Sequence, residues 1–285
     1  MKKYWIAGGL VLAVVLGVIA MIRSGSDEPV SSTQPTEGTY IALGDSVAAG
    51  VGLKDYSDSS ACDRTRQSYP EVLAKALNYR LTHVACSGAK TTEGLIGRQT
   101  VNNLALPPQI EALQSDNRPD LVTITIGAND ANWTTYLTKC YTAVCGSQAD
   151  TDGVAAGVVQ AATNLDRALR QIQSTYPSET PRVVVTGYYR LFPDTPASSS
   201  ACTELSGIEP AELAWIRQLQ DTIDDALRAT AAKYAFARFV PVDFGGHELC
   251  TDDPWIQGIG AKAPYHPTEA GQAAIARQIR SALGL

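Results

Sequence analysis

The sequence has no excess of positive charge: 23 Lys and Arg residues are outweighed by 29 Asp and Glu residues, which gives a net charge of -6 at pH 7. Proteins that bind nucleic acids use basic side chains to neutralise the phosphate backbone, and their affinity depends on that neutralisation. The composition therefore argues against DNA or RNA as a partner.

The six cysteines include no closely spaced C-x-x-C pair of the kind found in structural zinc sites. We therefore expect no bound metal. Disulfides persist in oxidising compartments and are rare in the cytosol, so six cysteines indicate an exported protein. Many pairings are possible, but the layout favours bridges between sequence neighbours: Cys62 with Cys86, Cys140 with Cys145, and Cys202 with Cys250.

The N-terminus differs in composition from the rest of the chain. Two lysines precede residues 4–22, which carry no charge, and Arg23 follows them. A helix of that length rises roughly 28 Å, close to the ~30 Å of a bilayer core, although a long signal peptide fits as well and a buried core helix is a third alternative. We predict that residues 1–23 are a signal peptide or a membrane anchor. The preceding positive charges place the rest of the chain outside the cytoplasm.

Residues 24–38 are rich in Ser, Thr, Pro and Glu, which predicts a flexible linker. No internal repeat or second linker follows, so residues 39–285 are expected to form one domain. Five short apolar runs alternate there with segments of helical spacing, a pattern typical of a parallel sheet covered on both faces. We predict an α/β fold, a three-layer α/β/α sandwich with a five-stranded parallel sheet. The strand runs are residues 39–45, 80–88, 120–130, 182–190 and 238–246, and the main helical segments are 69–79, 151–176, 210–234 and 273–283.

Ligands of open parallel sheets bind beyond the carboxyl ends of the strands. Three predicted strands end in small or polar residues there: "GDS" at 44–46, "SGA" at 87–89 and "GAND" at 127–130. Ser46 is a candidate nucleophile because a helix start stabilises developing negative charge, or else a plain helix cap. The G-x-S-x-G elbow of other hydrolases is absent, since position 48 is Ala.

A nucleophilic serine needs a base, and the chain has only three histidines. His83 lies within a predicted strand and is expected in the core. His247 sits just past the fifth strand run, near Cys250, and is a weaker alternative with a structural hydrogen-bonding role. His266 lies in a short loop directly before the predicted helix N-cap Thr268, so it is the best candidate base.

An oxyanion needs hydrogen-bond donors where the charge develops. Gly88 lets a backbone N–H approach a substrate closely because it has no Cβ, and the Asn129 carboxamide is a donor. Each also has a structural alternative, Gly88 as a turn former and Asn129 as a helix cap.

Together these residues resemble the SGNH hydrolase superfamily, the GDSL esterases and lipases, over nearly all of residues 39–285. Its four blocks occur in order: "GDS" with Ser46, "CSGA" with Gly88, "GAND" with Asn129 and "YHPTEAG" with His266. The six-cysteine layout further resembles the secreted actinobacterial-type esterase and lipase subgroup, in which bridges join successive cysteines. The resemblance implies a flavodoxin-like SGNH fold.

The resemblance also implies roles. Ser46 would attack the ester carbonyl, and His266 would take its proton and return one to the leaving alcohol. The Ser46 N–H, the Gly88 N–H and the Asn129 side chain would form the oxyanion hole. An acyl-enzyme would form and be released by water, with no metal and no organic cofactor.

One position departs from the usual pattern. Many members carry Asp three residues before the histidine to orient the imidazole, and here that residue is Ala263. In the subgroup with similar cysteines a backbone carbonyl can take over this task, and the Ala263 carbonyl is our first expectation. Asp252 or Asp253 reaching the ring from a nearby loop is the alternative.

The sequence thus predicts an extracytoplasmic serine esterase or lipase, a monomer, acting on small-molecule or lipid esters. The membrane would be a partner only through an uncleaved N-terminal segment. Alternatives are an O-acetyl esterase or acyltransferase acting on cell-wall glycan and, from another class, a catalytically silent binding module. Residues 133–145 and 192–202 are expected to line the cleft as loops closed by the bridges.

Overall fold

The structure is a computed structural model that describes residues 38–56, 61–116, 118–194 and 202–285. These residues belong to one compact unit. None of the helices in these ranges is long and apolar enough to cross a membrane. The predicted signal peptide or anchor at residues 1–23 lies outside the described residues, as does all of the predicted linker except Gly38, where the first strand begins.

Five parallel strands form the central sheet in the order β2-β1-β5-β6-β7. The middle strands are near-continuous apolar runs, as expected for strands buried on both faces; all five residues of β5 are buried. The predicted five-stranded parallel sheet is therefore confirmed. The strands are β1 (Gly38–Gly44), β2 (Tyr79–His83), β5 (Leu121–Thr125), β6 (Arg182–Thr186) and β7 (Ala237–Val240).

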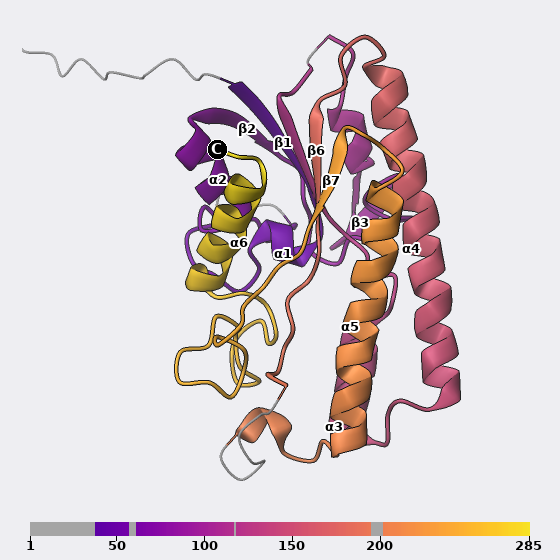
Figure 1. The fold of residues 1–285 in the computed structure, drawn as a ribbon, viewed down its shortest axis with the longest axis vertical. Coiled ribbons are helices and arrows are strands. Elements are labelled where there is room, and N and C mark those ends of the chain that lie inside the picture. Colours follow the sequence, from indigo (N-terminus) through magenta and orange to yellow (C-terminus); the bar gives the residue numbers. More distant parts are fainter. Residues whose placement is uncertain (1–37, 57–60, 117, 195–201) are drawn as a thin grey trace, which may run out of the picture. The chain divides into compact units, whose positions relative to one another are not determined.

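Four helices cover the two faces and complete the three predicted layers. On one face, α4 (Gln148–Thr175) and α5 (Pro210–Ala231) lie side by side, and on the other α2 (Tyr69–Leu77) packs against α6 (Glu269–Ala282) (Figure 1). Apolar residues at helical spacing face the sheet in each case.

The last helix, α6, begins four residues earlier than the segment assigned from the sequence. Thr268 caps it as expected, because its side chain accepts a hydrogen bond from the Gly271 N–H at 3.3 Å. Ile275 and Ile279 are buried as predicted, whereas Leu283 is the half-buried C-cap.

Several short elements were not predicted. A hairpin pairs β3 (Gln99–Val101) with β4 (Leu104–Leu106), and its loop residues Asn102 and Asn103 both have positive φ, as a type I′ turn requires. The others are two 3-10 turns, η1 (Gln109–Ala112) and η2 (Thr203–Leu205). Such elements are too short for hydrophobic periodicity to reveal them. The helix start expected at Ser46 is present as a one-turn helix, α1 (Ser46–Ala49).

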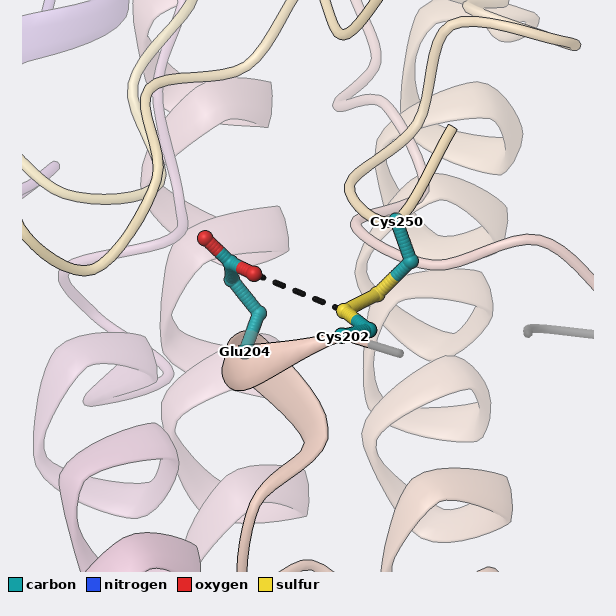
Figure 2. Close-up of side chains that lie close together, drawn as sticks. All are labelled: Cys202, Glu204 and Cys250. Atoms are coloured by element: carbon teal, nitrogen blue, oxygen red, sulfur yellow. Dashed lines mark hydrogen bonds between the residues drawn. A yellow bond between two sulfur atoms is a disulfide. The ribbon is translucent and has the colours of Figure 1, made fainter. Parts of the chain in front are cut away.

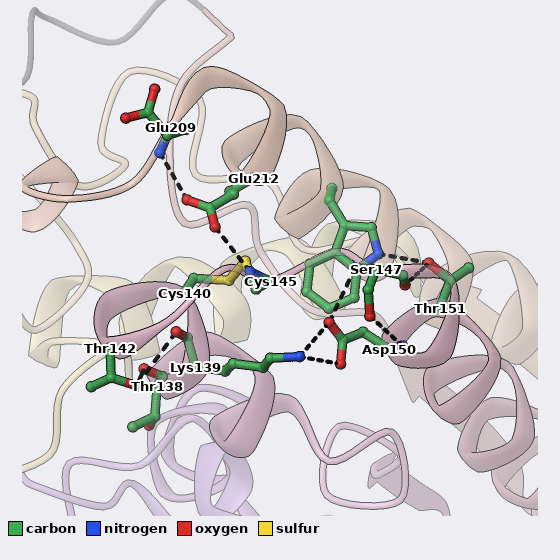
Figure 3. The surroundings of a disulfide bond; sticks show 11 residues. Thr138, Lys139, Cys140, Thr142, Cys145, Ser147, Asp150, Thr151, Glu209 and Glu212 are labelled. Atoms are coloured by element: carbon green, nitrogen blue, oxygen red, sulfur yellow. Dashed lines mark hydrogen bonds and ion pairs between the residues drawn. A yellow bond between two sulfur atoms is a disulfide. The ribbon is translucent and has the colours of Figure 1, made fainter.

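Residues 133–142 are a helix, α3 (Trp133–Thr142), rather than the expected loop. The disulfide between Cys140 and Cys145 closes its C-terminal end (Figure 3). Beside it, Lys139 pairs with both carboxylate oxygens of Asp150 at 2.7 and 2.8 Å, and the Cys145 N–H donates to Glu212 at 2.9 Å. These bonds fix α3 to the starts of α4 and α5.

All three disulfides join sequence neighbours, Cys62 with Cys86, Cys140 with Cys145 and Cys202 with Cys250. At the third, the Glu204 carboxylate lies 3.4 Å from the sulfur of Cys202 (Figure 2). This group brings three side chains with potential metal ligands together. Because both sulfur atoms are in the disulfide, neither offers the thiolate that a metal site would need.

The bridges close chain segments of different length, with sequence separations of 24, 5 and 48 residues. A cross-link restricts the unfolded chain more when its loop is longer. Replacing the pair Cys202 and Cys250 by Ala should therefore lower the free energy of unfolding by about 2 kcal/mol more than replacing Cys140 and Cys145. Urea denaturation of the two double variants measures the difference, and the opposite order would contradict the expectation.

Candidate active site

The carboxyl ends of β1 and β5 are level at one edge of the sheet. Gly44 pairs with Thr125 at the end of the ladder, and the Asp45 N–H still donates to the Thr125 carbonyl at 2.9 Å. On the other side of β1, the Cys86 N–H donates to the Gly44 carbonyl at 2.9 Å. The three turns predicted to carry the chemistry therefore leave the sheet side by side.

Gly44, the first residue of "GDS", allows the chain to leave β1 close to its neighbour. Its φ is +149°, and a Cβ at this position would lie 2.5 Å from the Thr125 carbonyl oxygen. The Gln109 side chain holds the residue by accepting from the Gly44 N–H at 2.7 Å and donating to its carbonyl at 2.9 Å. A side chain at residue 44 would displace the turn that follows.

Ser46 and His266 are brought together although 220 residues separate them. The His266 Nε2 lies 2.8 Å from the Ser46 Oγ, within hydrogen-bond distance. The N-cap of α1 is Asp45, whose Oδ1 accepts from the Val47 N–H at 2.9 Å, and Ser46 is the first helical residue. Asp45 therefore caps α1, and the Ser46 hydroxyl is left to interact with His266.

The carbonyl that faces the ring of His266 belongs to Pro264, and the expectation of Ala263 is wrong by one residue. The His266 Nδ1 lies 3.0 Å from the Pro264 oxygen, whereas the Ala263 carbonyl accepts from the His266 backbone N–H at 3.3 Å. This turn has Pro at its second position and Tyr265, with φ of +67°, at its third, the features of a type II turn. The central peptide of such a turn is oriented so that its oxygen is free to face the ring.

Burial lowers the pKa of His266 below its ordinary value, and the carbonyls of Pro264 and Ala263 oppose this shift. The neutral ring carries its proton on Nδ1, where a carbonyl accepts it. Nε2 is then left as an acceptor directed at the Ser46 hydroxyl.

The other two histidines lie elsewhere. His83 is in β2, with its Nε2 3.1 Å from the Ala48 carbonyl oxygen, and burial lowers its pKa. His247 stacks on Trp255 with ring centroids 3.7 Å apart, and its Nδ1 lies 2.8 Å from the Asp253 carbonyl. Asp253 thus lies beside His247, and its carboxylate is 3.3 Å from the same nitrogen.

Three groups of hydrogen-bond donors lie at these turns. The Asn129 Nδ2 donates one hydrogen to the Ala89 carbonyl at 2.9 Å, which leaves its second hydrogen available. The backbone N–H groups of Ser46 and Gly88 have no hydrogen-bond partner within the described part of the chain. Gly88 is exposed, with φ of +73°, and is not among the residues that line the adjoining cavity.

Buried side chains join the Gly88 and Asn129 turns. Asp130 accepts from the Thr91 N–H at 2.9 Å and from its hydroxyl at 2.5 Å, and Asn164 of α4 donates to the same hydroxyl at 3.1 Å. Burial raises the pKa of Asp130, while the bonds from Thr91 lower it. No local pattern in the sequence predicts this network, because its members lie far apart along the chain.

A cavity of about 270 Å³ opens beside Ser46 and His266. Its lining comes from α3, α5, the turns after β1, β5 and β6, and residues 263–266. Most of its surface is apolar. The apolar lining includes Val47, Ala128, Trp133, Leu137, Leu191 and Ile223. Of the first predicted segment, Trp133, Thr134, Leu137 and Thr138 line the cavity, from a helix rather than a loop, whereas residues 139–145 do not. Of the second, residues 192–194 and 202 are not among the lining residues, and residues 195–201 lie outside the described residues.

A serine hydroxyl bonded to an imidazole, with free amides beside it at the edge of a parallel sheet, defines a serine hydrolase site. The sequence narrows the class further: residues 42–274 match the GDSL-like Lipase/Acylhydrolase family, to which the chain belongs. Members of this family hydrolyse carboxylic esters, and the protein is a carboxylic ester hydrolase.

Similar proteins come from Streptomyces. A lipase of Streptomyces rimosus is 32% identical over 89% of each chain, and Lipase 1 of Streptomyces coelicolor is 29% identical over 95% of this chain and 96% of its own. The crystal structure of the extracellular lipase from S. rimosus superposes with a TM-score of 0.67, covering 86% of this chain and 99% of that one. Phospholipase A1 from Streptomyces albidoflavus gives 0.68 at 31% identity, covering 86% and 98%.

Because Pro264, and not a carboxylate, faces His266, replacing both Asp252 and Asp253 by Asn should leave ester turnover within about tenfold of wild type. Steady-state hydrolysis of a p-nitrophenyl ester measures this. A loss approaching the roughly 10⁴-fold effect of removing a triad aspartate would show that one of these carboxylates orients the ring.

Proposed function

We propose that Ser46 is the nucleophile and His266 the general base of an acyl-enzyme mechanism. The 2.8 Å contact between the Ser46 Oγ and the His266 Nε2 carries this proposal. The Ser46 oxygen attacks the ester carbonyl while its proton passes to Nε2. The imidazolium then protonates the leaving alcohol as the tetrahedral intermediate collapses to the acyl-enzyme. Water, deprotonated by the same nitrogen, releases the acid.

The developing oxyanion would be bound by the N–H groups of Ser46 and Gly88 and by the Asn129 carboxamide. The two backbone groups are free among the described residues, and the carboxamide retains one hydrogen after its bond to Ala89. Such donors act most strongly where water is excluded.

The apolar cavity supports the proposal that the acyl part of the ester substrate is longer than acetyl. The cavity volume of about 270 Å³ is more than an acetyl group fills. An acetyl group would leave most of this apolar surface uncovered. The cavity therefore favours lipid or medium-chain esters over acetylated glycans.

The domain is proposed to act outside the cytoplasm. Three disulfides between sequence neighbours support an oxidising compartment, and a similar lipase from S. rimosus is described as extracellular. Cleavage or retention of residues 1–23 remains a prediction from the sequence.

The full chain should hydrolyse p-nitrophenyl esters, with kcat/KM rising from acetyl to octanoyl, because a longer acyl chain covers more of the apolar lining. Ser46→Ala should abolish the activity. Wild-type turnover no greater than that of Ser46→Ala on every ester would refute the proposal. A preference for acetyl would refute only the assignment of the cavity to the acyl chain.

The pH dependence of kcat/KM follows from His266. A base must be neutral to accept a proton, and a histidine is neutral above its pKa, which burial here lowers below 6.5. Activity should therefore persist below pH 6.5, and the acidic half-point of the kcat/KM profile should lie beneath that value. A half-point near pH 7 would instead point to Asp45, since burial raises the pKa of its carboxyl to about 7.

A further inference from the structure

The hydroxyl of Tyr188 lies between two of the turns that carry the proposed chemistry. Tyr188 follows β6, is 8% exposed, and lines the cavity. Its Oη lies 2.5 Å from the Asp45 Oδ2, in the turn that leads to Ser46. The Ala128 N–H, in the turn that leads to Asn129, donates to the same oxygen at 3.1 Å.

The direction of these two bonds is fixed by chemistry. A backbone N–H can only donate, so the Tyr188 oxygen accepts from Ala128 and its own proton is directed to Asp45. The second oxygen of Asp45 accepts from the Val47 N–H. Both carboxylate oxygens therefore face donors. Within the described residues, the Tyr188 hydroxyl is the one group that forms hydrogen bonds with both turns.

The backbone of Tyr188 is hydrogen-bonded to side chains of α5. Its N–H donates to the Asp224 Oδ1 at 2.9 Å, and its carbonyl accepts from the Gln220 Nε2 at 2.8 Å. Both helix residues are buried. Hydrogen bonds to α5 therefore hold the Tyr188 backbone in place, and a fixed backbone is needed if the hydroxyl is to position neighbouring groups.

We propose that Tyr188 is a positioning residue of the oxyanion hole: its hydroxyl fixes the distance between the Ser46 and Asn129 turns. The inference rests on the proposed function. Ser46 directly follows Asp45, and Asn129 directly follows Ala128, so each bond of the hydroxyl lies one residue from a proposed oxyanion donor. Two donors from different turns can bind one oxygen only if the turns are held at a fixed spacing.

The charge of Asp45 depends on the same hydroxyl. Burial raises the pKa of Asp45, and the bond from Tyr188 is the largest influence that lowers it. Without the Tyr188 hydroxyl the pKa of the Asp45 carboxyl would rise further. The proton that Asp45 then binds would lie on Oδ2, the oxygen that has lost its donor. The Ser46 turn would lose its connection to the Asn129 turn in either protonation state.

The test is Tyr188→Phe in the full chain, which keeps the ring that lines the cavity and removes only the hydroxyl. We expect kcat for p-nitrophenyl butyrate to fall by about 10- to 100-fold, because small misplacements of catalytic groups cost about that much, while KM changes by less than about threefold. Inhibition by an alkyl trifluoromethyl ketone should weaken by the same factor as kcat. In that adduct the Ser46 Oγ bonds to the ketone carbon, its proton moves to His266, and the carbonyl oxygen becomes the oxyanion.

Tyr40→Phe is the matched control. Tyr40 is a buried tyrosine of β1, absent from the cavity lining, and its hydroxyl lies 2.6 Å from the Thr123 hydroxyl. This variant should lower the melting temperature as a lost buried hydrogen bond does, with kcat and ketone inhibition unchanged. Equal effects of the two variants on kcat, or a Tyr188→Phe enzyme within twofold of wild type, would overturn the positioning role. So would a fall in kcat without weaker ketone inhibition.

Asp45→Asn provides a second variant should Tyr188→Phe fail to fold. Asparagine still caps α1 but presents an NH₂ group where the Tyr188 proton needs an acceptor. It should reproduce the losses of kcat and of ketone inhibition, and wild-type values would overturn the inference. An inactive wild type would instead refute the proposed function, so the two failures are distinguishable.

Discussion

The level ends of β1 and β5 are the constraint on which the site depends. Because Gly44 pairs with Thr125 in the last step of the ladder, the turns that begin with Asp45 and with Ile126 leave the sheet beside each other. A shift of register by one residue would separate the turns and reverse the faces of β1. Glycine at position 44 is part of the same constraint, since any Cβ there would meet the Thr125 carbonyl.

The backbone hydrogen bonds between strands end at that edge. Beyond it, hydrogen bonds from buried side chains connect the turns. Tyr188 joins the Ser46 turn to the Asn129 turn, and Asp130 joins the Asn129 turn to the Gly88 turn through Thr91. Gln272 of α6, fully buried, accepts from the Tyr69 N–H and donates to the Val47 carbonyl, which ties the helix after His266 to α1. Buried polar groups are costly unless paired, so these networks hold each turn in one arrangement.

The sequence was informative where a pattern repeats locally. Apolar runs and helical spacing predicted the sheet and its covering helices, and the residue types at strand ends indicated Ser46, Gly88 and Asn129. His266 was indicated by its place directly before the last predicted helix. α3 was missed because its ten residues mix Thr, Lys and aromatic side chains, and bonds to other segments hold it in place. The choice of Pro264 over Ala263 depends on one turn dihedral, and Tyr188 acts on Asp45 from 143 residues away, so neither leaves a local pattern.

A carbonyl rather than a carboxylate beside His266 has a chemical consequence. Both fix the tautomer with a proton on Nδ1, but only a carboxylate adds a full negative charge that would favour the imidazolium. With the Pro264 carbonyl, burial dominates and the pKa of the ring falls. The proposed base is therefore weaker but remains neutral in mildly acidic surroundings. The Pro264 carbonyl does not supply the stabilisation that a carboxylate would give to the imidazolium, so the proposed mechanism depends more strongly on the proposed oxyanion donors.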